Sequence, residues 1–402
     1  AIEKEIANQV SYAALNPAVQ ETMRQIAALR EDVGARCGLA KEIAALRSIP
    51  GEIGTLIRAR GHKNGHDHYV QTLSQGLALF AMAFYGKPIV YRTTDFKTNE
   101  YRNLLGGNLF EDHEDNPMLG YRGVSRDIHD WEIESFKLAR SAYGAHNLQL
   151  MLPFVRTLEQ ARAMRAYLDT VHNLRSGEDG LKIILMSELP SNAILARQFI
   201  QEFDGFSIGS NDMTQMVLAT DRDNSSLSHI YDEEDPAVVW AILVTIFSGQ
   251  KFGKKVGFCG QGVANSEVLR GLVAISGITS ASVVPDTYYR TKQDFAAAEA
   301  LNISASGLGK WLGEQHQAKL VKLLEAAGKA DVAKLASDPA KIRAWYDAET
   351  ARLHGELRDS LGGSRENTAR KALKTFRATF HKPVIYAAWN WNETVEDALH
   401  QA

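Results

Sequence analysis

The sequence has few cysteines, few prolines and no long hydrophobic run. Its 402 residues include 2 cysteines, Cys37 and Cys259, and 10 prolines. Because the two cysteines lie far apart and form no CxxC pair, they provide neither a disulfide framework nor a cysteine metal site. We therefore expect a protein of a reducing compartment, the cytoplasm.

The longest apolar run covers residues 237–247, well short of the roughly 18–20 residues that a membrane-spanning helix needs. It predicts a buried helix. Residues 1–10 have mixed charge and no apolar core of a signal peptide, so we expect no secretion signal.

Charge of neither sign dominates the sequence. The 45 basic and 48 acidic residues give a net charge of −3, which offers no electrostatic reason to expect nucleic acid or an anionic membrane as a partner. With 45% hydrophobic and 23% charged residues, the composition is typical of a globular protein and excludes disorder. The length allows two or three domains, or one barrel of about 250 residues with an appendage.

Short apolar runs alternate with longer amphipathic stretches from about residue 33 to residue 287, a pattern typical of parallel strands connected by helices. Eight parallel strands favour a closed (β/α)8 TIM barrel within the α/β class. An open doubly wound sheet is the alternative, but its GxGxxG loop after the first strand is absent. The predicted strands are residues 35–39, 88–92, 119–124, 148–153, 182–187, 205–209, 255–259 and 280–285.

Helical patterns flank this region. Residues 1–30 predict two short helices, and residues after 291 are rich in Ala, Lys, Glu, Leu and Gln, which predicts a C-terminal helical extension. The final apolar piece, residues 383–391, fits a strand or a docking segment. The predicted domains are an N-terminal helical segment (1–30), the barrel (31–295) and the helical extension (296–402).

Functional residues of such barrels stand at the C-terminal ends of the strands. Glu188 and Asp212 each follow a predicted strand and lie 24 residues apart, one typical strand and helix repeat. Two carboxylates with room for water and substrate oxygens describe a Mg²⁺ site. The arginines near the strand ends suit a phosphate or carboxylate, because guanidinium groups bind both in bidentate fashion; they are Arg92, Arg122 and Arg222.

Each of these residues also has a purely structural interpretation. A lone carboxylate at a strand end can cap a helix or pair with an arginine, and Cys259 can be a small buried hydrophobic residue. His62, His66 and His68 lie in a polar loop without a partner cluster, so a structural metal there is not favoured. From the residues alone, the sequence predicts an anion-binding α/β barrel.

Seven segments, taken together and in order, resemble the phosphoenolpyruvate-binding barrel of the phosphoenolpyruvate synthase family. More distantly they resemble pyruvate phosphate dikinase and Enzyme I of the sugar phosphotransferase system. The resemblance covers residues 30–295, and its segments are YRTTDFKTNEYRNLLGG (91–107), NPMLGYRGVSR (116–126), LPFVRT (152–157), SELPSNAIL (187–195), FDGFSIGSNDMTQMVLATDRDN (203–224), GFCGQG (257–262) and PDTYY (285–289).

The resemblance implies Mg²⁺-dependent phosphoryl transfer between a phosphohistidine on a mobile domain and the enolate of pyruvate. It implies that Glu188 and Asp212 hold Mg²⁺, and that Cys259 moves a proton at the methyl carbon. The implied catalytic cations and substrate-binding residues are Arg92, Arg122, Lys97, Asn99, Gly209, Ser210, Asn211 and Arg222.

The chain departs from the family pattern at two places. Lys41, Ile43 and the Ile49-Pro50 pair stand where the family has an arginine, a phenylalanine and a histidine-proline, so one phosphate contact differs. After the cysteine loop, residues 263–266 replace a Ser-Asp-His-Pro-like run. These changes motivate the alternative of another hydroxyl acceptor, such as a phenol.

The sequence contains no ATP-grasp region and no phosphohistidine motif. We therefore expect a fragment, one subunit of a split enzyme, or a free-standing barrel, with the phosphohistidine and ATP-grasp domains elsewhere. By analogy with its relatives, the chain is expected to form a homodimer through the barrel. A free-standing lyase or hydrolase of a 2-oxo acid stays open as well, as does a non-catalytic binding subunit, although the full set of predicted site residues argues against such a subunit.

Overall fold

The computed structural model describes residues 51–104, 107–109, 111–126 and 130–402. The chain divides into two compact units, residues 1–185 and 186–402, which are considered separately. The predicted N-terminal helices and the predicted strand at 35–39 lie outside the described residues, as do the departures from the family pattern at residues 41–50.

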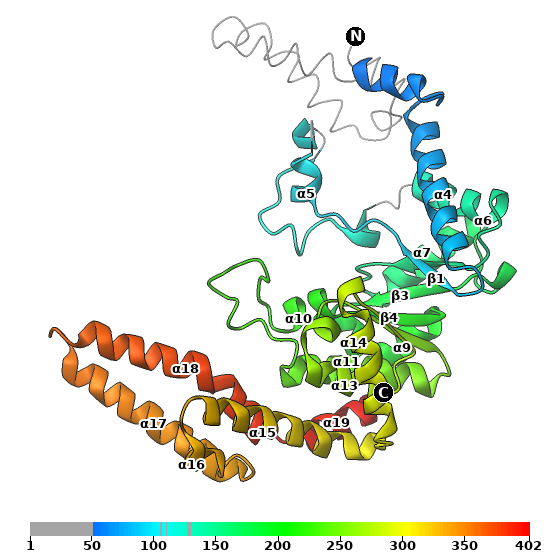
Figure 1. Cartoon of the computed structure of the whole chain (residues 1–402). Coiled ribbons are helices and arrows are strands. Elements are labelled where there is room, and N and C mark those ends of the chain that lie inside the picture. The colour runs from blue at the N-terminus through cyan, green and yellow to red at the C-terminus, as the bar shows by residue number, and fades with distance from the viewer. Residues whose placement is uncertain (1–50, 105–106, 110, 127–129) are drawn as a thin grey trace, which may run out of the picture. The chain divides into compact units, whose positions relative to one another are not determined.

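The first unit contains three parallel strands in chain order, with Ile89 opposite Leu148 and Leu150 opposite Ile183 (Figure 1). The middle strand is buried along its whole length, as expected for a parallel strand covered on both faces. The elements are α4 (Gly65–Ala83), β1 (Ile89–Arg92), α5 (Thr98–Arg102), η2 (Gly107–Leu109), η3 (Gly123–Ser125), α6 (Asp130–Ala142), β2 (Leu148–Leu152), α7 (Leu158–Thr170), η4 (Glu178–Gly180) and β3 (Ile183–Ser187), whose last two residues belong to the second unit.

The second unit repeats this alternation, again with parallel strands in chain order. The predicted buried helix at 237–247 is confirmed, since it forms the centre of α11, which begins at the N-cap Asp235. The elements are α8 (Pro190–Ile194), α9 (Ala196–Glu202), β4 (Gly205–Gly209), α10 (Ser210–Val217), α11 (Pro236–Lys251), β5 (Lys255–Cys259), α12 (Gly262–Asn265), α13 (Glu267–Ile275), β6 (Ser280–Ser282), η5 (Pro285–Thr287) and α14 (Tyr288–Ala300).

The α/β class with parallel strands is confirmed, and six of the eight predicted strands correspond to β1 to β6. The predicted strand at 119–124 is wrong, because this segment forms a turn that leads into η3. Gly123 has φ +58°, which a strand does not accommodate, and a Cβ there would lie 2.8 Å from the carbonyl oxygen of Pro153. The described residues form six parallel strands and not a closed eight-stranded TIM barrel, so closure of the barrel stays a prediction.

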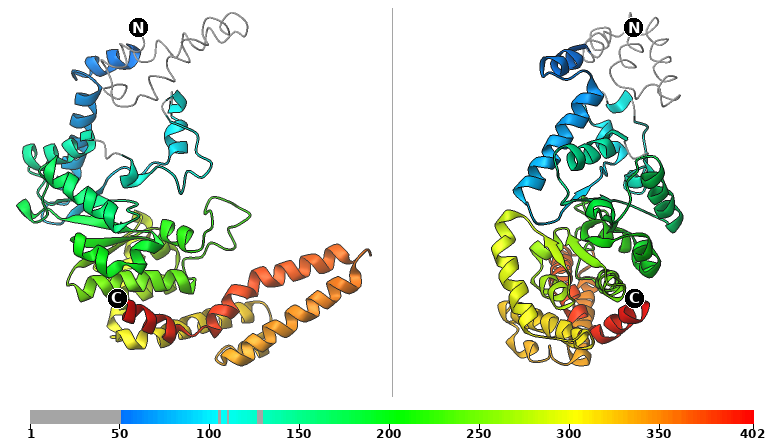
Figure 2. Two further views of the ribbon diagram at one scale, coloured as in Figure 1. Left: turned by 180° about the vertical axis from the view of Figure 1, so that it is seen from behind. Right: turned by 90° about the vertical axis from the view of Figure 1, so that its right-hand side faces the viewer.

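The C-terminal part of the second unit is helical, as predicted. Its last predicted piece, residues 383–391, is not a strand, since it ends α18 and begins α19; the side chains of Val384, Tyr386 and Trp391 in it are buried. Figures 1 and 2 show α17 and α18 side by side as an antiparallel hairpin. The elements are η6 (Ala305–Gly307), α15 (Leu308–Ala326), α16 (Ala330–Ala333), α17 (Pro339–Ser360), α18 (Glu366–Ala388) and α19 (Trp391–Gln401). The domain boundaries proposed from the sequence stay a prediction.

Aromatic side chains hold the hairpin together. The ring of Tyr346 stacks on Phe376 at 5.5 Å, and Trp345 meets Phe376 and Phe380 edge-on, each at 5.8 Å. Such pairs add to the free energy of apolar burial.

In the described ranges, no helix combines the length and the apolar character that crossing a bilayer requires.

We expect Phe376→Ala to lower the free energy of unfolding by about 3–5 kcal/mol, because it leaves a cavity where the α17 and α18 rings meet. Urea unfolding followed by circular dichroism measures this loss. The exposed neighbour Thr375 provides the matched control, Thr375→Ala. Equal losses in the two variants would contradict the packing argument.

Candidate functional site

A buried ion pair lies at the centre of the predicted cationic residues in the first unit. Arg122 donates from Nε to Asp95 Oδ1 at 3.0 Å and from Nη2 to Asp95 Oδ2 at 2.6 Å. The Asp95 and Arg122 side chains are 2% and 5% exposed. Because a buried charge is tolerated only when it is paired, this bidentate contact fixes the Arg122 guanidinium.

The ring of Phe154 contacts two arginines. The Arg122 Cζ atom is 4.0 Å from the ring centroid, and the Arg156 Cζ atom is 4.6 Å from it. Arg156 also donates to Ser125 Oγ, which ties it to the turn that follows Arg122. Burial, and then the neighbouring Arg122 charge, lowers the pKa of Arg156 from its ordinary value. Arg156 stays protonated, since guanidinium groups keep their proton in proteins.

Arg92 is the more accessible of the predicted cations. It ends β1, its side chain is 43% exposed, and its Nη1 atom lies 3.8 Å from Asp95 Oδ2. Arg92 and Arg122 therefore share one carboxylate, with Arg122 held tightly and Arg92 loosely. A loosely held guanidinium can turn to an incoming anion.

Lys97 and Asn99 lie at the start of α5. The Lys97 backbone N–H donates to Glu100 Oε2 at 2.7 Å, and the Lys97 Nζ atom lies 3.9 Å from Glu100 Oε1. Asn99 is exposed in the first turn. Arg126, a further cation of this region, makes a bidentate pair with Glu111 at 2.9 and 2.6 Å, which gives it a structural role.

Glu188, directly after β3, is the first candidate site residue of the second unit. Its side chain is buried, with the residue 1% exposed. The Asn192 Oδ1 atom accepts from the backbone N–H groups of Glu188 and Leu189 at 3.2 and 3.1 Å, which fixes the turn. A Cβ on Gly209 would lie 2.9 Å from Glu188 Oε2, so the carboxylate lies against the bare backbone where β4 ends.

The first turn of α10 continues from that point. Ser210 is buried, whereas Asn211 and Asp212 are half-buried, and Asp212 stands where a helix N-terminus favours negative charge. The Asn211 Oδ1 atom accepts from the backbone N–H of Gln261 at 3.3 Å. This contact connects α10 to the turn after β5.

Cys259 ends β5 and lies opposite Gly209 in the strand register. Its Sγ atom lies 3.7 Å from Met186 Sδ, and the same Met186 sulfur would lie 3.2 Å from a Cβ on Gly209. Glu188, Gly209 and Cys259 are thus neighbours at one end of the strands. The structure brings together the predicted carboxylate, the predicted glycine and the predicted thiol.

Arg222 lies in the loop between α10 and α11. Its side chain is 42% exposed, and its Nε atom is 3.7 Å from Asp223 Oδ1. Burial, and then Glu233, raises the pKa of Tyr231, while the Arg222 charge acts to lower it. Arg222 is therefore close enough to the Tyr231 hydroxyl to influence its titration.

The residues present fit a magnesium ion. Glu188 and Asp212 would supply two hard carboxylate ligands, and the missing side chain at Gly209 makes room beside Glu188. Within the described ranges, no three His, Cys, Asp or Glu residues are grouped to hold a metal by themselves. Water and substrate oxygens would complete the coordination. The predicted polar loop of the three histidines is wrong for His66 and His68, which lie in the first turn of α4, where His66 Nε2 is 2.7 Å from Glu134 Oε2.

Sequence reasoning missed Glu132, which is 1% exposed on α6. Its carboxylate accepts from the Tyr91 hydroxyl and from Thr94 N and Oγ1, the last two at 2.8 and 3.0 Å. This contact orients the segment after β1 that leads to Asp95. No local signal marks Glu132, whereas Arg156, also missed, stands in the LPFVRT segment.

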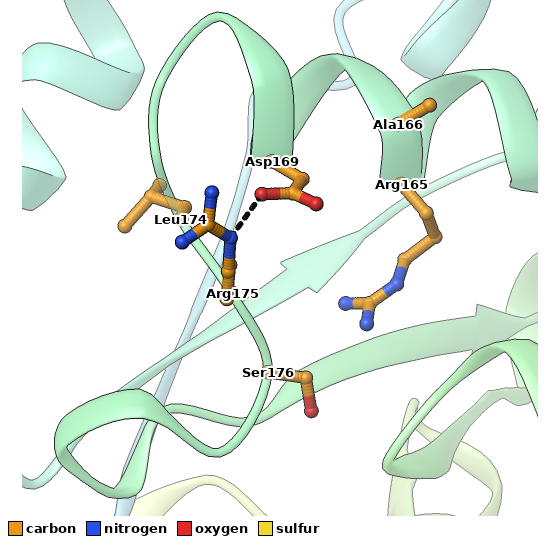
Figure 3. A pocket seen from close by; sticks show the side chains of 6 residues that line it. All are labelled: Arg165, Ala166, Asp169, Leu174, Arg175 and Ser176. Carbon is orange, nitrogen blue, oxygen red and sulfur yellow. Dashed lines mark hydrogen bonds and ion pairs between the residues drawn. The ribbon is translucent and has the colours of Figure 1, made fainter.

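A separate hollow of the first unit holds none of the predicted residues. Figure 3 shows it at the end of α7, where Asp169 accepts from Arg175 across from Arg165. Its lining is Arg165, Ala166, Asp169, Leu174, Arg175 and Ser176. Arg175 is paired with Asp169, and none of the six residues follows the C-terminal end of a strand, so we place the candidate site elsewhere.

Residues 53–300 match the family described as PEP-utilising enzyme, PEP-binding domain. The chain is 45% identical over 239 residues to the phosphoenolpyruvate synthase of Escherichia coli (strain K12), covering 58% of this chain and 30% of the relative. It is 41% identical over 260 residues to that of Pseudomonas aeruginosa (strain UCBPP-PA14), covering 62% and 33%. For that of Aquifex aeolicus (strain VF5) the identity is 42% over 253 residues, covering 61% and 29%.

The chain therefore spans about a third of the length of the curated relatives it matches. The resemblance to the phosphoenolpyruvate synthase family, inferred from short segments, is confirmed. Because the family match covers more than half of the sequence, the chain belongs to the PEP-binding domain family of the PEP-utilising enzymes.

Proposed function

We propose that this chain is the part of a phosphoenolpyruvate-synthase-like phosphotransferase that binds pyruvate or phosphoenolpyruvate with Mg²⁺. The phosphoryl group would be exchanged with a phosphohistidine on another domain or subunit, which also takes part in ATP use. The observation that carries the proposal is the Glu188 carboxylate lying against Gly209, beside the first turn of α10 and opposite Cys259.

The relatives support the reaction class, since they are named phosphoenolpyruvate synthase. As the chain spans about a third of their length, the complete reaction requires groups that these residues do not provide. The phosphohistidine partner and a homodimer formed by this chain are likewise proposals.

Charge neutralisation is the main task of such a site. An enolate and a phosphoryl group in transfer both carry negative charge that must be compensated before the reaction can proceed at neutral pH. Arg92, Arg122 and Arg222 would bind the phosphoryl group and the carboxylate, with Asn211 donating from its amide. Lys97, Asn99, Gly209 and Ser210 complete the proposed substrate-binding set.

Glu188 and Asp212 would hold Mg²⁺, which when bound supplies Lewis-acid stabilisation of the enolate oxygen. Cys259 would add or remove the proton at the methyl carbon. A thiol suits this step because its ordinary pKa of about 8.5 is close to working pH.

We expect Glu188→Gln to weaken Mg²⁺-dependent binding of phosphoenolpyruvate at least about tenfold, which corresponds to about 1.4 kcal/mol. The variant keeps the shape of the side chain but loses the charge that the metal needs. Calorimetric titration with and without Mg²⁺ measures the change, and Glu325→Gln is the control, because Glu325 is exposed on α15.

If the unmodified protein does not bind phosphoenolpyruvate in the presence of Mg²⁺, the pyruvate assignment is wrong. Other hydroxyl acceptors, phenols included, would then be titrated in its place. Equal affinities of the Glu188→Gln variant and its control would instead contradict only the metal assignment.

Arg92 and Arg122 should respond differently to removal of their charge. Arg92→Met should weaken phosphoenolpyruvate binding about tenfold and leave unfolding unchanged, because its side chain is 43% exposed. Arg122→Met should lower the free energy of unfolding by about 3–5 kcal/mol, since it leaves Asp95 buried without a partner.

Calorimetry and urea unfolding distinguish these two outcomes. Adding Asp95→Asn to the Arg122→Met variant should recover part of the stability, because the uncompensated charge is removed. A stability loss in Arg92→Met as large as that in Arg122→Met would contradict the assignment of a binding role to Arg92 and a structural role to Arg122.

A further inference from the structure

The segment 231–235, just before α11, contacts two different parts of the second unit. The Tyr231 hydroxyl lies 3.4 Å from the Asn211 carbonyl oxygen, and Glu233 lies against the turn after Cys259. Asp232 and Glu234, in contrast, contact the C-terminal helices. Alternate residues of one short segment thus reach the candidate site and the helical extension.

The contacts of Asp232 and Glu234 with the C-terminal helices are two ion pairs and one hydrogen bond from a tyrosine. Asp232 Oδ2 accepts from Lys382 Nζ and from the Tyr386 hydroxyl of α18, both at 3.1 Å. Glu234 accepts from Lys319 Nζ of α15 at 2.9 Å with each of its carboxylate oxygens. Both carboxylates are more buried than their lysine partners, with side chains 23% and 11% exposed against 33% and 56%.

Glu233 and Glu234 also contact the two ends of α12, the short helix that begins three residues after Cys259. At its start, a Cβ on Gly262 would lie only 2.8 Å from Glu233 Oε1. Burial raises the pKa of Glu233, and the Ser210 hydroxyl and the Gly262 N–H oppose this by stabilising the carboxylate. At its end, Ser266 donates from Oγ to Glu234 Oε1 at 2.8 Å.

Glu234 is therefore a connection between α15 and α12. The same carboxylate binds Lys319 on one side and Ser266 on the other, and His316 Nδ1 lies 3.7 Å away. A carboxylate that is 11% exposed depends on its cation, because an unpaired buried charge is strongly unfavourable. Removing Lys319 should draw Glu234 toward water, which displaces α12.

We propose that Glu234, held by Lys319, is a positioning residue that sets the place of α12 and so the orientation of the Cys259 thiol. The C-terminal helices thereby support the acid–base part of the site. This inference rests on the proposed function, in which Cys259 moves the proton at the methyl carbon of pyruvate.

The test follows that proton. In deuterated water with Mg²⁺, the Cys259 thiolate takes a proton from the pyruvate methyl group, so the C–H bond breaks, an S–H bond forms and the enolate results. After the thiol exchanges with solvent, it returns a deuteron to the same carbon. Proton NMR of pyruvate measures the exchange, and calorimetry with phosphoenolpyruvate and Mg²⁺ measures binding separately.

We expect Lys319→Met to slow methyl exchange about tenfold while the affinity for phosphoenolpyruvate changes less than about twofold. Lys319→Arg should restore the rate, since it keeps the cation. Lys322→Met is the matched control, because Lys322 is exposed one turn along the same helix and forms no ion pair with a described residue. A merely structural role would move the unfolding midpoint and leave the exchange rate of the folded protein unchanged.

A second measurement does not need activity. In a Cys37→Ser background, the alkylation rate of Cys259 by iodoacetamide reports the accessibility of the thiol. Lys319→Met should raise this rate severalfold and Lys322→Met should not.

The outcomes separate the two proposals. Absence of methyl exchange in the unmodified protein contradicts the proposed function, and alkylation then still decides the positioning role. Unchanged exchange and unchanged alkylation in Lys319→Met overturn the positioning role and leave the proposed function intact.

Discussion

Pairing of buried carboxylates with partners distant in sequence determines much of the local structure in both units. Asp95 is buried with Arg122, Glu132 accepts from Tyr91 and Thr94, and Glu234 is held by Lys319. In each case the partner comes from a segment distant in sequence. The pairing is needed because burying an unpaired charge is strongly unfavourable. Ion pairs and hydrogen bonds of this kind therefore help to fix the segments that lead to the candidate site residues.

The sequence predicted the repeating elements well, because parallel strands that are covered on both faces read as short apolar runs. Strand β2 is buried throughout and was predicted with nearly its observed bounds. The prediction for residues 119–124 was wrong. Their apolar residues resemble a strand pattern, but the positive φ of Gly123 is incompatible with a strand. That angle arises from close backbone approach to Pro153, a long-range contact that no local pattern reveals.

The candidate site could be predicted only as far as its residues stand in recognisable segments. Glu188, Asp212 and Cys259 each follow or end a strand, so topology alone placed them near strand ends. The supporting residues are different: Glu132 and Lys319 lie on helices, 38 and 85 positions from the residues they hold. Nothing in the local sequence distinguishes them from any solvated acid or lysine, so only the folded chain identifies their partners.

Phe154 gives the cationic group one more property. Its aromatic ring lies within cation–π distance of both the Arg122 and the Arg156 guanidinium groups and offers them the negative electron density of its face. Cation–π attraction to the ring offsets part of the repulsion between the two like charges, which is still felt in the lowered pKa of Arg156. Both guanidinium groups are thus held in place by the protein's own contacts, so their positions do not depend on a bound ligand.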